Sequence, residues 1–125
     1  MQRPHVTGSA RSTSLLARPQ ISPERAEALA RIEGQLKLSA ARTEERLREM
    51  ESTLAELLRD RGTIQEDRDA ASQVVSAVHG DLRLLHRTLE RFADGRFGWC
   101  NGCGGEIPVE RLEAVPTATS CARCA

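Results

Sequence analysis

The sequence FGWCNGCGGEIPVERLEAVPTATSCARCA, residues 97–125, contains two Cys-x-x-Cys pairs that are separated by seventeen residues. This spacing is typical of a four-cysteine zinc site, because a two-residue gap lets both thiolates of a pair face one ion. Four protein ligands complete the zinc tetrahedron and leave no open position for catalysis. We therefore expect one structural Zn²⁺ ion, with the ligands Cys100, Cys103, Cys121 and Cys124.

Disulfide bonds are the alternative use of four cysteines. The first twenty residues contain no apolar run long enough for the core of a signal peptide, so nothing indicates an oxidising compartment. A thioredoxin-like redox pair requires a βαβ setting, and no strand-like run precedes Cys100. Zinc is the better interpretation, and its binding would contribute directly to the free energy of folding.

The composition indicates solvated helices rather than a large globular core. Only 2% of the 125 residues are aromatic, none is tyrosine, and 29% are charged. The 18 basic and 18 acidic side chains cancel, which argues against binding nucleic acid through its phosphates. Residues 1–20 carry three arginines and no acid, and we expect a disordered basic tail there; a mitochondrial transit peptide has a similar composition.

A first long helix is predicted from Pro23 to about Arg61. Ser22 and Glu24 flank the proline as helix-start residues, since serine caps free N–H groups and an acid suits the positive end of the helix. Apolar residues then recur every seven positions, with Thr43 as the one polar member. This seam contains Leu29, Leu36, Thr43, Met50, Leu57 and Ile64, with Ala40, Leu47 and Leu54 on the adjoining stripe.

A second helix shows the cleanest periodicity in the chain, with apolar residues in alternating steps of four and three. Its seam contains Ala71, Val75, Val78, Leu82, Leu85, Leu89 and Phe92. Gly62 interrupts the pattern between the two helices, and we place a turn near residues 62–67. The helix is expected to end near Asp94-Gly95, where glycine can adopt the left-handed conformation.

Two helices with matching seams and a short connection predict an all-α antiparallel coiled-coil hairpin. The expected organisation is a tail at 1–20, the hairpin at 21–95 and the four-cysteine module at 96–125. We expect a monomer, although the same seams could pair between two chains. Because so few aromatics are available for a core, Phe92, Phe97 and Trp99 are expected to pack between the zinc module and the hairpin.

The residues around the cysteines carry a family resemblance. Phe97-Gly98-Trp99-Cys100 opens the first pair, and Arg111-Leu112-Glu113-Ala114-Val115-Pro116 precedes the second. With these flanks, about residues 92–124 resemble the zinc finger of the DksA/TraR family of bacterial proteins. The resemblance implies a transcription regulator whose partner is core RNA polymerase, rather than a protein that binds a DNA sequence.

The resemblance also implies a functional tip. In the family, the hairpin enters the secondary channel of the polymerase, and acidic residues at its tip modulate transcription initiation near the active site. The tip pattern is an acid, two residues, an aspartate, one residue and an alanine. Glu66, Asp69 and Ala71 take these places, with Glu66 standing where the family has aspartate, and Asp67 adds a carboxylate. Acids at a helix start can equally just stabilise the helix dipole.

Two other functions remain open from the residues alone. A zinc-capped coiled-coil adaptor would have the same architecture without acting on the polymerase. A DNA-binding zinc finger is disfavoured, because residues 104–120 offer Arg111 as their one base against three glutamates. The chain shows no nucleophile-and-base pair and no phosphate-binding loop, so we do not expect an enzyme. No stretch is apolar enough to span a membrane, and we expect a cytoplasmic protein.

Overall fold

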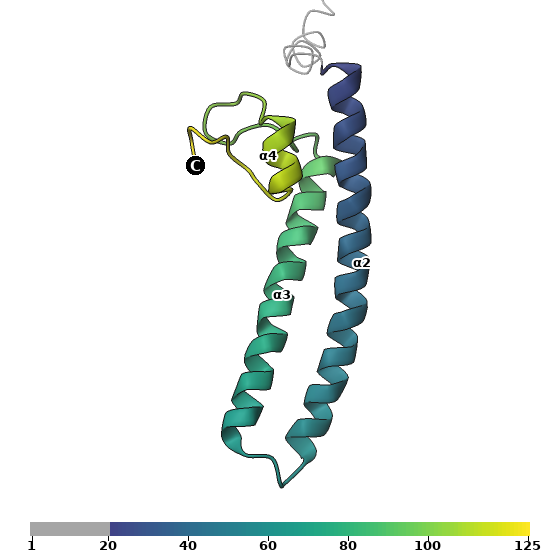
Figure 1. The fold of residues 1–125 in the computed structure, drawn as a ribbon, viewed down its shortest axis with the longest axis vertical. Coiled ribbons are helices and arrows are strands. Elements are labelled where there is room, and N and C mark those ends of the chain that lie inside the picture. The colour runs from purple at the N-terminus through teal and green to yellow at the C-terminus, as the bar shows by residue number, and fades with distance from the viewer. Residues whose placement is uncertain (1–20) are drawn as a thin grey trace, which may run out of the picture.

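The computed structural model describes residues 21–125; the tail expected at residues 1–20 lies outside this range. Helices α2 (Pro23–Arg59) and α3 (Gln65–Ala93) run antiparallel, and the short helix α4 (Val109–Ala114) lies beside the end where α3 finishes (Figure 1). Apart from one antiparallel bridge between Trp99 and Glu106, the described part of the chain has no β-structure. The all-α hairpin with a terminal four-cysteine module is confirmed.

Helix α2 begins as its sequence indicates. The Ser22 hydroxyl accepts a hydrogen bond from the backbone N–H of Arg25 at 3.1 Å, and Pro23 occupies the first helical position, where no N–H partner is needed. The helix ends at Arg59, and Asp60 adopts an extended conformation. These local signals give a helix of 37 residues, about 55 Å long at 1.5 Å per residue.

The connection between the helices lies slightly earlier than the expected turn at residues 62–67. Asp60 organises it: its carboxylate accepts from Gly62 N–H at 2.9 Å, and its carbonyl accepts from the Arg68 guanidinium at 2.9 Å. Helix α3 already begins at Gln65, with Glu66 and Asp67 in its first turn. Acidic residues there suit the positive end of the helix, so this polar stretch is helix rather than turn.

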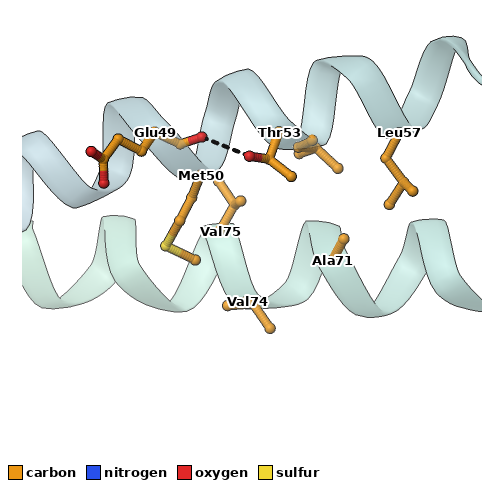
Figure 2. A pocket seen from close by; sticks show the side chains of 8 residues that line it. Glu49, Met50, Thr53, Leu57, Ala71, Val74 and Val75 are labelled. Carbon is orange, nitrogen blue, oxygen red and sulfur yellow. Dashed lines mark hydrogen bonds between the residues drawn. The ribbon is translucent and has the colours of Figure 1, made fainter.

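Two apolar clusters line the hairpin. The one toward the connection contains the buried residues Leu47, Val75 and Val78, with Met50, Leu54 and Leu82 partly buried around them. Figure 2 shows Met50 and Leu57 of α2 opposite Ala71 and Val75 of α3. Ile64 does not continue the predicted seam: it precedes α3 and is 55% exposed, because the chain reverses direction there.

The second cluster, called the base cluster below, joins the C-terminal module to the base of the hairpin, which is the end where α3 finishes. It consists of buried residues from α2 and from the segment after α3: Ile32, Leu36, Phe97, Cys100, Ile107 and Leu112. Ile107 and Leu112 are completely buried. The first three turns of α2 lie beyond the point where α3 ends. They pack against the C-terminal module rather than projecting into solvent. Within residues 21–125, no helix combines the length and apolar character of a membrane span.

Replacing Leu47 by alanine tests the seam. Leu47 is 5% exposed, and its truncation should lower the free energy of unfolding by about 2–4 kcal/mol, because the helices cannot close the cavity completely. Urea unfolding followed by far-UV circular dichroism measures the change. Leu58→Ala is the matched control, since Leu58 is 46% exposed and should cost well under half as much. Equal losses in the two variants would show that the seam does not pack as described.

Candidate metal centre

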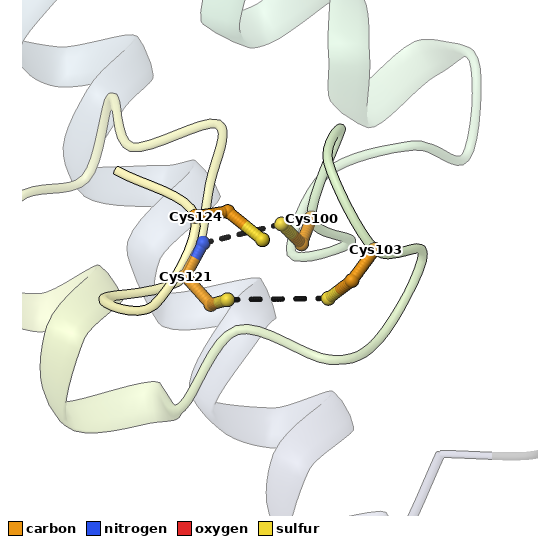
Figure 3. Close-up of side chains that lie close together, drawn as sticks. All are labelled: Cys100, Cys103, Cys121 and Cys124. Carbon is orange, nitrogen blue, oxygen red and sulfur yellow. Dashed lines mark hydrogen bonds between the residues drawn. The ribbon is translucent and has the colours of Figure 1, made fainter.

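The four cysteines come together at the base of the hairpin. Their sulfur atoms all lie within 4.8 Å of one another, and the Sγ atoms of Cys103 and Cys121 are 3.9 Å apart (Figure 3). A zinc ion with four Zn–S bonds of about 2.3 Å requires S···S separations of about 3.8 Å. All four are free thiols, so the disulfide alternative is not what the structure contains. The cluster fits one structural zinc ion.

Backbone N–H groups prepare Cys100 as a ligand. The amides of Gly102 and Cys121 donate to its sulfur at 3.2 and 3.3 Å. Hydrogen bonds from backbone amides, that of Cys121 first, lower the pKa of the Cys100 thiol to about 6. A lowered pKa favours the thiolate at neutral pH, and the thiolate is the form that binds metal. Cys100 is also the most buried of the four and belongs to the hydrophobic core.

The pKa of Cys124 shifts upward, opposite to that of Cys100, and this indicates that the cluster requires a cation. Hydrogen bonds between the Cys124 thiol and the neighbouring sulfurs, that of Cys121 first, raise the pKa of Cys124 to about 12, and the charge of Cys100 adds a smaller effect in the same direction. Four crowded sulfurs cannot all be thiolates without a compensating positive charge. A divalent cation supplies that charge, and zinc suits an all-sulfur tetrahedral set.

Short-range backbone contacts set the positions of the two pairs. Cys100 N–H donates to the Gly105 carbonyl at 2.8 Å, which closes the first knuckle. Asn101 N–H donates to the Thr119 carbonyl at 2.8 Å and brings the second pair to the first. Between them, α4 places the buried side chain of Leu112 in the base cluster, so the seventeen intervening residues fold back on themselves.

Two glycines are required by close approach. A Cβ atom at Gly102 would lie 2.9 Å from the Cys124 sulfur, closer than such atoms pack in proteins. Gly98 has φ +86°, and a Cβ there would lie 2.9 Å from the Arg25 guanidinium. Side chains at these positions would displace a zinc ligand in one case and the contact with α2 in the other.

The expected aromatic packing residues lie next to the metal site. Phe92, near the end of α3, stacks on Phe97 with ring centroids 3.7 Å apart and planes at 15°. Phe97 is 5% exposed and belongs to the base cluster, with Phe92 packed against it. Trp99 is half-buried in the bridge with Glu106. The two phenylalanines therefore connect α3 to the knuckle directly.

The sequence interpretation did not identify Arg25. This side chain reaches from the first turn of α2 to the module, donating to the carbonyls of Ile107 at 2.8 Å and Gly98 at 2.9 Å. Its Nε atom also lies 3.3 Å from the carboxylate of Glu106. An arginine near a helix start looks like an ordinary surface residue, yet Arg25 is only 9% exposed.

Arg91 makes the corresponding contact from α3. Its guanidinium donates to the carbonyls of Arg96 and Trp99, both at 3.1 Å, and to the Asn101 side chain at 3.2 Å. Burial, together with the charge of Arg96, lowers the pKa of Arg91 from its ordinary value. Each helix thus contributes one buried arginine that binds backbone carbonyls of the segment around Cys100.

The acidic residues of the hairpin are not part of the metal centre. The connection between α2 and α3 lies at the end of the hairpin opposite α4 and the C-terminus (Figure 1). Glu66, Asp67 and Asp69 are exposed at the start of α3, and Ala71 is half-buried. Gln65 donates to the Asp69 carboxylate at 2.8 Å, whereas the carboxylates of Glu66 and Asp67 have no partner among residues 21–125.

By its fold and its metal site, the protein belongs to the class of helical hairpins that carry a structural four-cysteine zinc module at their base. Residues 95–125 match the model of the prokaryotic dksA/traR C4-type zinc finger. The chain is 36% identical over 87 residues to General stress protein 16O of Bacillus subtilis. The matched residues cover 70% of this chain and 53% of that protein.

Two DksA proteins are also similar. The chain is 44% identical over 43 residues to the RNA polymerase-binding transcription factor DksA of Escherichia coli, covering 34% of this chain and 28% of that protein. The solved structure of transcription factor DksA2 from Pseudomonas aeruginosa has the same fold, with a TM-score of 0.74 and 24% identity over 90% of this chain and 92% of that one.

The C-terminal module is therefore a zinc finger of the dksA/traR C4 type, and the chain is similar to General stress protein 16O and to DksA proteins. The matched part spans about half the length of General stress protein 16O and less than a third of DksA from Escherichia coli. The match over residues 95–125 confirms the resemblance drawn from the residues around the cysteines, and the C4 finger with its four clustered sulfurs confirms the structural zinc ion.

Replacing Gly102 by alanine should weaken zinc binding about tenfold or more, because the new methyl group displaces Cys124 from the cluster. Competition with a chromophoric chelator measures the affinity, and elemental analysis should find one zinc ion per wild-type chain. Gly105→Ala is the control, since a Cβ there makes an ordinary contact 3.6 Å from the Cys103 sulfur. Wild-type zinc affinity in Gly102→Ala would contradict the described geometry.

Replacing Arg25 by methionine should lower the free energy of unfolding by about 3 kcal/mol, because two buried carbonyls lose a charged donor. Denaturant unfolding gives the loss, and hydrogen exchange of the Ile107 amide should accelerate. Arg31→Met removes an equivalent side chain from an exposed position of α2 and should change little. If both variants unfold alike, Arg25 does not hold the module on the hairpin.

Proposed function

We propose that this protein is a transcription regulator that binds core RNA polymerase. The proposal rests on the dksA/traR-type zinc finger, on the fold shared with DksA2, and on relatives named as RNA polymerase-binding transcription factors. Because the matched part covers a minority of those relatives, polymerase binding is the point that experiment must establish first. Such a factor would act in the bacterial cytoplasm.

The mechanism we propose is insertion of the hairpin into the secondary channel of the polymerase. The observation that carries it is the separation of rigid base from acidic tip. Helix α3 has 29 residues, which gives about 44 Å of reach from the zinc module to its first turn. At that far end, the unpartnered carboxylates of Glu66 and Asp67 and the oriented carboxylate of Asp69 are exposed.

Exposed carboxylates at the end of a narrow shaft are suited to a charged active site. Carboxylate oxygens bind Mg²⁺ and interact with basic side chains, and both interactions strengthen where water is excluded. In the proposed mechanism, the tip changes the stability of promoter complexes without making or breaking a covalent bond. The protein would therefore regulate the enzyme and not be one.

Direct reading of DNA receives little support from this geometry. The helix next to the zinc site, α4, has six residues, and Arg111 is its one base against Glu110 and Glu113. The Arg111 guanidinium is moreover engaged, since its Nε donates to the Ser120 carbonyl at 2.9 Å. A recognition helix needs free basic side chains toward the phosphates and bases.

The double substitution Glu66→Ala with Asp69→Ala tests the tip. It should leave binding to purified core RNA polymerase within about twofold of wild type and abolish the effect on transcription from a responsive promoter in vitro, because the tip carboxylates act on initiation while other residues of the hairpin hold the polymerase. Binding is measured by fluorescence anisotropy and transcription by run-off assays.

A matched control removes two acids elsewhere, Glu27→Ala with Asp81→Ala, both from exposed positions far from the tip. This variant should bind the polymerase and affect transcription like wild type. Wild-type binding with no effect of the tip substitution on transcription would refute the secondary-channel mechanism. Failure of the wild-type protein to bind core polymerase would refute the proposed function and favour a zinc-capped adaptor.

A further inference from the structure

A groove of about 330 Å³ lies between α2 and α3 near the hairpin connection. Its lining is almost wholly apolar, with Met50, Leu54 and Leu57 from α2 and Ala71, Val74 and Val75 from α3. Figure 2 shows Met50 and Leu57 directed toward α3, with Ala71 and Val75 directed toward α2. The groove follows the seam that, closer to the base, is filled by Leu47 and Val78.

The groove exists because the seam is underfilled here. Ala71 places a single methyl group where every other seam position of α3 carries valine, leucine or phenylalanine, so Leu54 and Leu57 of α2 remain only partly buried. Thr53 adds no free polar group, since its hydroxyl donates to the Glu49 carbonyl of its own helix at 3.1 Å. Val74 forms the outer edge and is 51% exposed. Such a surface has affinity for an apolar side chain and offers almost no hydrogen bonds.

The charge around the groove specifies the partner further. Residues 49–74, which include the groove and the tip, carry seven acidic side chains and three arginines, a net charge of −4. The remainder of the two helices, 23–48 and 75–93, carries nine basic and seven acidic side chains, a net charge of +2. The hairpin is therefore polarised, with its apolar groove inside the negative end. A basic partner is attracted more strongly to this end than to the rest of the shaft.

We propose that this groove is a docking site for an apolar side chain on a basic protein segment, and that this segment belongs to RNA polymerase. The identity of the partner rests on the proposed function. The groove would fix the depth and rotation of the hairpin, while the tip carboxylates beyond it remain free to act. Docking and activity are thus assigned to different residues of the same end of the hairpin.

Val74→Arg tests this site, because it adds a cation and a long side chain at the edge of the groove. Binding to purified bacterial core RNA polymerase should weaken about tenfold or more. Leu38→Arg is the matched control: Leu38 is also 51% exposed, lies on α2 in the positive part of the hairpin, and should bind within about twofold of wild type. Val74→Glu should lose less affinity than Val74→Arg, because its charge attracts a basic partner. Zinc content and thermal unfolding confirm that each variant is folded.

The binding measurements distinguish the apolar groove, the basic partner and the proposed function. If the wild-type protein binds the polymerase and Val74→Arg binds equally well, docking at the groove is refuted while the proposed function stands. Equal losses in Val74→Arg and Leu38→Arg, or equal losses in Val74→Arg and Val74→Glu, overturn the apolar site or the basic partner respectively. A concentration-dependent dimer in sedimentation that Val74→Arg abolishes would show that a second copy fills the groove. Absence of wild-type binding refutes both the proposed function and this inference.

Discussion

The structure depends on two buried guanidinium groups that bind the backbone of the segment around Cys100. Arg25 holds the carbonyls of Gly98 and Ile107, and Arg91 holds those of Arg96 and Trp99. A chain with so few aromatics cannot stabilise a loop of this length by apolar burial alone. Two of these carbonyls, those of Gly98 and Arg96, also accept a backbone N–H, and the guanidinium groups add a charged donor, which binds a carbonyl more strongly than a neutral amide does.

These contacts give the zinc module a fixed relation to the hairpin. Zinc holds the two cysteine pairs together, while the arginines and the base cluster hold the first pair against α2 and α3. Cys100 belongs to both sets, since it is a sulfur of the metal cluster and a buried member of the hydrophobic core. Metal binding and the packing of the helix ends are therefore physically coupled, so the orientation of the long shaft depends on the small module at its base.

The end of the hairpin near the connection differs from the base in which polar and apolar groups are buried. At the base, polar groups are buried and paired; toward the connection, acids are exposed and the apolar seam is left open beside Ala71. Stability is thereby concentrated where the module is anchored. The unsatisfied surface, both charged and apolar, is concentrated where a partner can reach it.

Cysteine spacing, flanking residues and heptad periodicity are local patterns, so the zinc site, the type of zinc finger and the helical hairpin could all be predicted from the sequence alone. It placed the connection a few residues late, since acids in the first turn of α3 resemble a polar loop. The burial of Arg25 and the groove beside Ala71 could be seen only in the folded structure. Arg25 is buried by contacts with residues 73 and 82 positions further along the chain, and the groove depends on the side chains of the facing helix. No local sequence pattern indicates contacts between residues so far apart.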